Sequence, residues 1–246
     1  GAAGARAPCY TPAMTTAAGA GAAPRSIDVI VPVRDEEEVL EHFHARVCAI
    51  DLPLHLVYVD NASTDRTPAI LRSFQGVTVI QHERDEGYGG SILDGFARST
   101  ADAIVVIDAD CEYPPESIPA LVAALAEHEV VYTSRFLGGR PAGMPGFRRF
   151  GNRFLTGVFN LLFRQRLTDL YTGCKALRRP VLEGLELERR GFEHVLELAV
   201  RLSRRGVRIA EVPIEYTPRS TGRSKMSHLS ETVKLCALLV RYWLAA

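Results

Sequence analysis

The stretch IDVIVPV at residues 27–33 sets the pattern of the first half of the chain. Similar β-branched runs follow at residues 54–60 (LHLVYVD), 77–81 (VTVIQ), 103–110 (AIVVIDAD) and 129–134 (EVVYTS). Between the runs, apolar residues recur with helical spacing, as at Val39, Phe43 and Val47. Apolar strands that alternate with helices are typical of a mostly parallel sheet with helices on both faces. The sequence therefore predicts an α/β fold, in which ligands bind beyond the carboxyl ends of the strands.

The two ends of the chain differ from this pattern. Residues 1–25 are dominated by Gly and Ala and show no periodicity, which is typical of a flexible leader. After residue 134 we expect helices over about 148–163 and 192–204, short strands over 207–212 and 213–218, and a last helix. We interpret the chain as a leader (1–25), one folded domain (26–225) and a C-terminal amphipathic helix (226–246).

Composition narrows the class of protein. The 246 residues include 29 Lys and Arg against 29 Asp and Glu, so no overall charge attracts nucleic acid, and we expect no nucleic-acid partner. The five cysteines are scattered without the spacing of a zinc site, which favours a reducing, cytoplasmic compartment. No apolar run reaches the roughly 20 residues that span a bilayer.

Carboxylates follow two of the expected strands. Asp108 and Asp110 end the run at 103–110, and alternate residues of an extended segment project to the same side. Two carboxylates on one side suit Mg²⁺ or Mn²⁺ bound to a diphosphate, and Glu112 would add a third oxygen. A bare Asp-x-Asp is more often a solvated turn, but Asp60 ends a second strand of the same sheet. Together the strand ends favour a metal and phosphate site.

The segment from Arg135 to Thr168 is rich in arginine and contains no Asp or Glu. Arginine matches the geometry of phosphate oxygens, so the segment predicts an anion site or a face toward an anionic membrane. Phenylalanines are interleaved with the arginines at positions 147, 150, 154, 159 and 163. We expect most of these rings to pack in the core. A second basic group, Arg219, Arg223 and Lys225, lies in a loop that would close over a diphosphate.

From residue 26 to about residue 228 the chain resembles the family 2 glycosyltransferases, most closely the branch that transfers mannose or glucose to polyprenyl phosphates such as dolichol phosphate. Nine segments carry the resemblance, in this order: VIVPVRDEE, VYVDNASTDRT, DEGYGGSILDGF, VVIDADCEYPP, TSR, FRRFGNRF, DLYTGCKALRR, GFEHVLELAVRLSRRGVRIAEVPIEY and RSTGRSKM. The resemblance implies a GT-A fold that binds a nucleotide-diphosphate sugar and inverts the anomeric carbon.

The resemblance also implies roles for individual residues. The nucleoside would be held by Pro32, Glu36 and Asp60, and the diphosphate by Arg219, Ser224 and Lys225. Asp108 would lie near the sugar, while the metal would be ligated by Asp110 and Glu112. The acceptor or phosphate pocket would be formed by Arg135, Arg149 and Asn152.

This chain departs from the family pattern at four positions. Asn61 stands where a second aspartate is common, and Glu112 where a glutamine is common. Tyr88 replaces a frequent lysine, and Cys174 an aromatic residue. The choice of base and of metal is therefore open.

The catalytic chemistry depends on the acceptor. A phosphate monoester is anionic at neutral pH and attacks without a dedicated base, so that arginines such as Arg135 only position it. A hydroxyl acceptor needs a carboxylate within hydrogen-bond reach, for which the candidates are Asp169, Glu193 and Glu197. We favour a polyprenyl phosphate; a soluble hydroxyl acceptor is the alternative, and a non-catalytic nucleotide-sugar-binding protein is a third reading.

The C-terminal segment predicts an amphipathic helix. Its apolar residues recur at spacings of three and four, at positions 226, 229, 233, 236, 240 and 243. Such a stripe either packs on the domain or lies on a membrane. Trp243 beside Arg241 suits the headgroup boundary, so we expect this helix and the segment from Arg148 to Arg166 to form a peripheral contact with the cytoplasmic membrane face.

Overall fold

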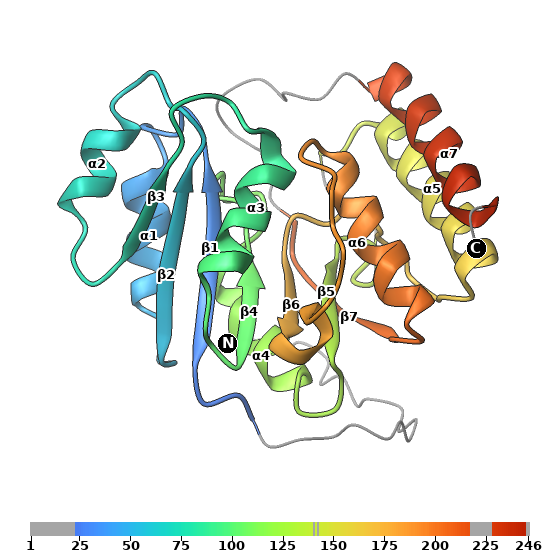
Figure 1. Cartoon of the computed structure of the whole chain (residues 1–246), viewed down its shortest axis with the longest axis horizontal. Helices are drawn as coiled ribbons and strands as arrows, with labels where there is room; N and C mark the ends of the chain where they lie inside the picture. Colours follow the sequence, from blue (N-terminus) through green and yellow to red (C-terminus); the bar gives the residue numbers. More distant parts are fainter. Residues whose placement is uncertain (1–22, 140, 142, 217–227, 245–246) are drawn as a thin grey trace, which may run out of the picture.

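The computed structural model describes residues 23–139, 141, 143–216 and 228–244, which form a seven-stranded sheet with helices on both faces (Figure 1). The strands are β1 (Ile27–Val33), β2 (Leu54–Asp60), β3 (Thr78–Gln81), β4 (Ala103–Val106), β5 (Val130–Ser134), β6 (Lys175–Arg178) and β7 (Ile209–Pro213). Their order is β3-β2-β1-β4-β6-β5-β7, and only β6 runs antiparallel to its neighbours. The α/β prediction is confirmed.

The helices lie in two layers. They are α1 (Leu40–Cys48), α2 (Thr67–Ser73), α3 (Gly87–Arg98), α4 (Ile118–Ala124), α5 (Gly146–Phe163), α6 (Glu193–Arg204) and α7 (His228–Leu244), with 3₁₀ turns at Pro115–Ser117 and Arg179–Leu182. One apolar core joins α1, α2 and α4 to the sheet, and a second joins α3, α5, α6 and α7 to its other face. Successive residues of β1 face the two cores in turn, so the strand is apolar throughout. Val29 and Val31 belong to one core and Ile30 to the other, and all three are fully buried.

The element boundaries follow the sequence closely in the first half of the chain and less closely in the second. The first two strands begin and end where the β-branched runs do, whereas β4 stops at Val106, short of Asp108. Strand β6 was not expected from the sequence, and of the two short strands expected near the C-terminus only β7 is present among the described residues. The leader over residues 1–22 and the basic loop over 217–227 lie outside the described residues.

The antiparallel strand β6 matters for the position of a functional site. The carboxyl ends of β1, β2 and β4 lie at one edge of the sheet, and β6 begins there because it runs the other way. Its first residue, Lys175, pairs with Val106, the last residue of β4. The segment that leads into β6 therefore meets the residues that follow β4.

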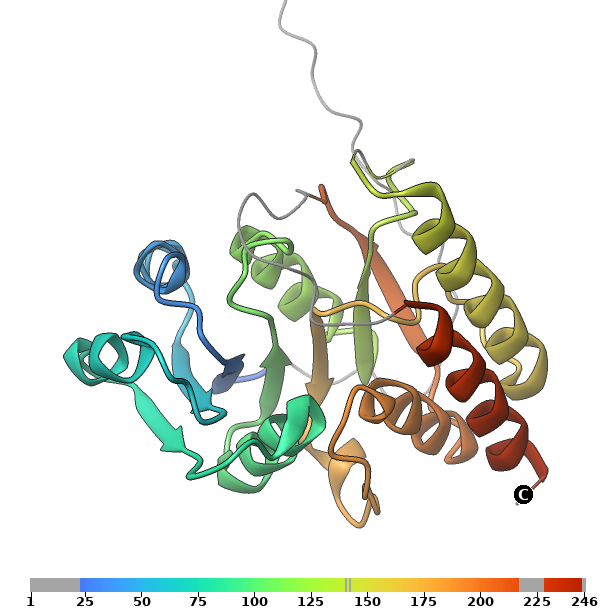
Figure 2. The same ribbon diagram turned by 90° about the horizontal axis from the view of Figure 1, so that it is seen from above.

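Helices α5 and α7 lie side by side along the outside of α6, at the end of the sheet formed by β5 and β7 (Figure 2). Leu235, Leu239 and Tyr242 form the buried side of α7, while Val240 and Trp243 are about half exposed. On α5 only Leu155, Thr156 and Phe159 are fully buried. The two helices therefore pack against the domain through one side each.

Candidate active site

The loops at the carboxyl edge of the sheet hold unusual backbone. Asp35 after β1, Ala62 after β2 and Cys111 after β4 have φ of 50°, 56° and 59°. Among the described non-glycine residues, the only other positive φ is at Arg164, at the end of α5. A left-handed non-glycine residue costs on the order of 1 kcal/mol, and such residues gather at functional sites. The strain marks this edge as the functional one.

Asp60, the last residue of β2, is fully buried and only partly satisfied. Its Oδ1 accepts the backbone N–H of Ser63 at 3.1 Å, but its Oδ2 has no hydrogen-bond partner among the described residues. An unpaired buried carboxylate oxygen costs free energy unless a donor reaches it. Pro32, partly buried in β1, pairs with Val59, and Glu36 begins the next turn, its N–H bonded to Thr67 Oγ1 at 2.9 Å. The three residues expected to hold a nucleoside thus lie on neighbouring strand ends.

Asn61, at a position where the family often has a second aspartate, forms hydrogen bonds with other residues of the protein. Its Nδ2 donates to Asp85 Oδ1 at 2.7 Å, and its Oδ1 accepts the N–H of Glu86 at 2.8 Å. Asp85 also pairs with Arg34, which follows β1. The Asn61 amide therefore ties the ends of β1 and β2 to the start of α3, which leaves Asp60 as the open acceptor at this strand end.

Asp108 lies two residues beyond β4, and α3 and the segment before β6 contact it. Tyr88 donates its hydroxyl to Asp108 Oδ1 at 3.0 Å. The other oxygen sits against Gly173, where a Cβ atom would approach it to 2.3 Å. Burial and the Asp110 carboxylate raise the pKa of Asp108 to about 7. A side chain at position 173 would displace the carboxylate, so the glycine is required by the position of Asp108.

Asp110 and Glu112 are both partly exposed and lie on one turn. Asp110 Oδ1 accepts the N–H of Glu112 at 3.0 Å, and Cys111 between them has the positive φ noted above. No three His, Cys, Asp or Glu side chains converge on one point within the described part of the chain. A Mg²⁺ or Mn²⁺ ion that is carried by a diphosphate needs only one or two protein carboxylates, because phosphate and water oxygens complete its shell. The two residues fit such an ion.

Arg135, Asp169 and Asn152 form one network. Arg135 donates from Nε and Nη2 to the two oxygens of Asp169 at 2.6 and 2.8 Å, and from its backbone N–H at 3.2 Å. Asn152 of α5 donates to Asp169 Oδ1 at 2.6 Å. The guanidinium of Arg135 also lies 5.6 Å from the ring centre of Tyr113 and 5.8 Å from that of Tyr216. The structure brings these three sequence-derived residues together.

The same network bears on Asp169, which was a candidate base for a hydroxyl acceptor. Asp169 is fully buried, and both of its oxygens are occupied by Arg135 and Asn152. It fixes Arg135 instead of facing a substrate. Arg149 lies nearby in the first turn of α5, partly buried, with its N–H bonded to the carbonyl of Pro145.

Glu197, which was expected on the acceptor side, is enclosed by contacts within the protein. Its side chain is 1% exposed, and Oε2 accepts the N–H groups of Glu188 and Arg189 at 2.9 and 2.8 Å. Tyr242 of α7 donates its hydroxyl to Oε1 at 3.1 Å. The carboxylate joins α6 to a loop and to α7. The predicted residues Arg219, Ser224 and Lys225 lie outside the described residues.

Two buried side chains, Lys175 near Asp108 and His194 near Lys175, had no functional role assigned from the sequence. Lys175 is 1% exposed, and burial lowers its pKa to about 8, against the opposing effect of Asp108. His194 at the start of α6 is fully buried, and burial lowers its pKa to about 3. In the sequence Lys175 stands in the segment DLYTGCKALRR, where the four-residue strand KALR is too short to show a periodicity.

Exposed apolar residues gather on α5 and α7. Of the ten large hydrophobic side chains that are exposed in the described residues, seven lie on these helices: Phe147, Phe150, Phe154, Leu161, Val240, Trp243 and Leu244. Phe150 and Phe154 stack with ring centres 6.3 Å apart. The expectation that most of the phenylalanines pack in the core is wrong, because only Phe159 is fully buried. Within the described residues, no helix is both long enough and apolar enough to cross a bilayer.

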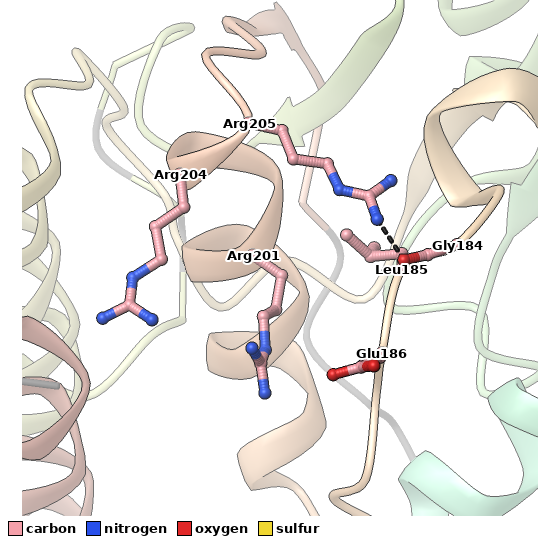
Figure 3. A pocket seen from close by; sticks show the side chains of 6 residues that line it. All are labelled: Gly184, Leu185, Glu186, Arg201, Arg204 and Arg205. Carbon is pink, nitrogen blue, oxygen red and sulfur yellow. Dashed lines mark hydrogen bonds between the residues drawn. The ribbon is translucent and has the colours of Figure 1, made fainter. Parts of the chain in front are cut away.

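A cavity of about 180 Å³ lies at the C-terminal end of α6 (Figure 3). It is lined by Gly184, Leu185, Glu186, Arg201, Arg204 and Arg205. Its arginines point apart: Arg204 donates to the carbonyl of Tyr242, and Arg205 to those of Glu183 and Gly184. The lining residues Arg201, Arg204 and Arg205 follow His194 by seven to eleven residues, roughly 10–17 Å along the helix at 1.5 Å per residue. The cavity is not part of the candidate site.

Comparison with known families and sequences agrees with this arrangement. Residues 28–185 match the family described as Glycosyl transferase family 2. The chain is 31% identical over 209 residues to a dolichol-phosphate mannosyltransferase of Pyrococcus furiosus, covering 81% of this chain but only 59% of that protein. It is 30% identical over 209 residues to an undecaprenyl-phosphate mannosyltransferase of Micrococcus luteus, covering 80% of this chain and 86% of that one.

Solved structures share the fold. Glucosyl-3-phosphoglycerate synthase from Mycobacterium tuberculosis, in complex with UDP, superposes with a TM-score of 0.69 at 20% identity, covering 89% of this chain and 80% of that one. The same enzyme with Mn²⁺, UDP and glucosyl-3-phosphoglycerate gives a TM-score of 0.68, also at 20% identity, covering 90% and 79% of the two chains. The GT-A fold expected from the sequence is thereby confirmed.

Proposed function

The chain belongs to glycosyl transferase family 2, which confirms the expectation of a glycosyltransferase, and from this premise we propose that it transfers a hexose from a nucleotide-diphosphate sugar to a polyprenyl phosphate at a membrane surface. The named relatives act on polyprenyl phosphates and are 31% and 30% identical to this chain over 209 aligned residues, which supports this acceptor class. The reaction inverts the anomeric carbon.

The donor binds at the carboxyl ends of β1, β2 and β4. Asp60 offers its unpartnered buried Oδ2 to an N–H of the nucleobase, beside Pro32 and Glu36. Asp108, oriented by Tyr88, faces the sugar. Arg219, Ser224 and Lys225, which lie outside the described residues, would bind the diphosphate.

A divalent cation, Mg²⁺ or Mn²⁺, would be held by Asp110 and Glu112. When bound, it neutralises the negative charge that develops on the leaving diphosphate. The partly exposed carboxylates of Asp110 and Glu112 lie on one turn and therefore present their oxygens to the same ligand. Solved structures of the same fold bind Mn²⁺ together with UDP, which supports a divalent cation.

The acceptor phosphate needs positioning and no base. Its anionic oxygen attacks the anomeric carbon on the face opposite the leaving diphosphate. Arg135 is preorganised for an anion because Asp169 and Asn152 fix its orientation and the Tyr113 and Tyr216 rings flank it. Preorganised charge acts on the transition state without the cost of reorganisation. Arg149, from the first turn of α5, completes the acceptor side.

Helix α5 is the single observation that carries the lipid-acceptor proposal. Near its amino end Asn152 belongs to the Arg135 network, and along the same helix Phe150, Phe154 and Leu161 are 73%, 51% and 81% exposed. A polar anion site and an apolar surface on one helix match a ligand with a phosphate head and a hydrocarbon chain. With α7, this surface forms a peripheral contact with the cytoplasmic membrane face.

The test is transfer of labelled sugar into lipid. The full chain is incubated with labelled GDP-mannose or UDP-glucose, Mn²⁺, and vesicles that contain a polyprenyl phosphate, and the organic-phase product is counted. We expect product with one donor, loss of product with EDTA, and none with the free polyprenol, which lacks the phosphate. Equal transfer to a soluble hydroxyl compound without vesicles would overturn the acceptor assignment and favour the soluble-acceptor alternative.

A further inference from the structure

Lys175 is a buried cation whose charge the proposed reaction does not yet use. Its side chain is 1% exposed, and its Nζ has no hydrogen-bond partner among the described residues. The ring of Tyr132, whose centre lies 5.2 Å from Nζ, gives a weak cation–π contact. A buried ammonium that makes no hydrogen bond is costly unless an opposite charge lies close to it.

The strand register identifies that opposite charge as Asp108. In the antiparallel ladder of β4 and β6, Val106 pairs with Lys175, so two residues further on Asp108 comes opposite Gly173. The contact of Asp108 Oδ2 with position 173 agrees with this continuation. Residues two apart on a strand point to the same face, and Asp108 and Lys175 are diagonal neighbours on that face. The register therefore makes Asp108 a carboxylate neighbour of the enclosed Lys175, without a direct salt bridge between the two side chains.

The other polar groups around Lys175 do not balance its charge. The hydroxyl of Tyr132 and both ring nitrogens of His194 are buried and have no hydrogen-bond partner in the described part of the chain. Asp169 is already occupied by Arg135 and Asn152. Asp108, in contrast, receives one hydrogen bond, from Tyr88, and lies beside the like charge of Asp110. Asp108 therefore has a hydrogen-bond donor in Tyr88 and a nearby positive charge in Lys175.

We propose that Lys175 is a positioning residue, whose buried positive charge holds the Asp108 carboxylate in the orientation that binds the sugar of the donor. This inference rests on the proposed function and names a residue that acts through Asp108. Lys175 itself does not touch the donor, because it is enclosed. Its effect is confined to the sugar, and the nucleoside diphosphate bound by Asp60 and the cation is insensitive to it.

The first experiment tests the pairing without any ligand. Urea unfolding is measured for the wild type, Lys175→Met, Asp108→Asn and the double variant. If the two charges interact, the double variant is destabilised by less than the sum of the single variants, since each single change already removes the same charge–charge interaction. Additive losses would overturn the pairing.

The second experiment tests the effect on the donor. Calorimetry compares GDP with GDP-mannose, and UDP with UDP-glucose, in the presence of Mn²⁺. In Lys175→Met the affinity for the nucleotide sugar falls by at least about tenfold, the size of one interaction with a charged group, while that for the nucleoside diphosphate changes by less than about threefold. In the Asp108→Asn background Lys175→Met has no further effect.

Arg178→Met is the matched control, because it removes a cation from the other end of β6, where Arg178 Nε is bonded to the carbonyl of Leu125. It lowers stability and leaves the ratio of the two affinities unchanged. The proposal is overturned if Lys175→Met weakens the affinities for the nucleotide sugar and the nucleoside diphosphate equally. It is also overturned if Lys175→Met still weakens nucleotide-sugar binding in the Asp108→Asn background. In either case Lys175 has only a structural role in the core. If the wild type binds neither nucleotide sugar, the proposed function fails, whereas the unfolding cycle still decides the pairing.

Discussion

The carboxyl edge of the sheet and the outer faces of α5 and α7 differ in the kind of group that lacks a partner: a buried polar atom at the edge, and exposed apolar side chains on the helices. At the edge, Asp60 is 0% exposed, and its Oδ2 has no hydrogen-bond partner in the described residues. On the helices, Phe150 and Leu161 are 73% and 81% exposed to water. An unpaired buried polar atom costs stability, and a contiguous exposed apolar patch is typical of an interaction site. The first region therefore suits a polar, charged ligand and the second an apolar one. Helix α5 belongs to both, through Asn152 in the Arg135 network and through its exposed phenylalanines.

The largest effect is expected at the metal site of the polar region. Asp110→Asn removes a charged ligand from a partly exposed turn, so we expect turnover to fall by about a hundred- to a thousandfold, as for loss of one electrostatic stabiliser of a transition state. The unfolding midpoint stays within a few degrees, because no core contact is removed. Turnover is measured at limiting Mn²⁺. Wild-type turnover under that condition would place the cation elsewhere.

The strand-end carboxylates were predictable because their signals are local. Asp60 ends a β-branched run and Asp108 follows one two residues beyond its end, and the turns after them follow within a few residues. Lys175 was not predictable, because β6 has only four residues and places a lysine where the pattern of a buried strand calls for an apolar residue. The contacts of Glu197 were not predictable for a related reason. Its hydrogen-bond partners at residues 188, 189 and 242 come together only through the packing of α6 and α7.

The phenylalanines of α5 show a second limit of sequence reasoning. Their spacing indicates a helix, but it does not show how much of the helix surface is covered. In the structure α5 is covered by the domain and by α7 along the side that holds Leu155 and Phe159. Phe147, Phe150 and Phe154 lie outside that contact. Which apolar residues face water is decided by the tertiary packing.

The second prediction separates two arginines of the acceptor side. Arg135→Ala leaves the buried Asp169 without its cation, so we expect the free energy of unfolding to fall by about 3 kcal/mol or more, together with loss of transfer. Arg149→Ala keeps its backbone bond to Pro145 and is expected to change stability by less than about 1 kcal/mol while still impairing use of the acceptor. Both variants should bind the nucleoside diphosphate like the wild type.

Calorimetry of the nucleoside diphosphate and urea unfolding check this pair. A variant Arg135→Met/Asp169→Leu removes both charges and should recover part of the lost stability without recovering transfer. If Arg149→Ala weakens the nucleoside diphosphate as much as the acceptor, the division between a donor side and an acceptor side is wrong.

The third prediction concerns the apolar region. Phe150→Ser and Phe154→Ser should each lower binding to vesicles by about tenfold, since burial of a phenylalanine side chain is worth roughly 1.5–3 kcal/mol. Flotation with anionic vesicles measures the bound fraction. Val79→Ser is the control, because Val79 is 39% exposed and lies on β3. β3 is the outermost strand on the side of the sheet away from β5 and β7, beside which α5 and α7 lie. An equal loss in the control, or none in either phenylalanine variant, would separate this surface from the membrane.

The smallest effect is expected where α7 is fastened to the domain. Tyr242→Phe removes the hydroxyl that donates to Glu197 Oε1, and a buried hydrogen bond of this kind contributes about 1 kcal/mol. Leu235 and Leu239 keep α7 in place by packing, so unfolding by urea should shift slightly and donor binding should not change. Vesicle binding should also be unchanged, because Tyr242 lies on the packed side of α7 and Trp243 on the exposed side. A loss of vesicle binding as large as that of Phe150→Ser would mean that α7 must leave the domain to meet the lipid, and the two regions would then be coupled through Glu197 instead of independent.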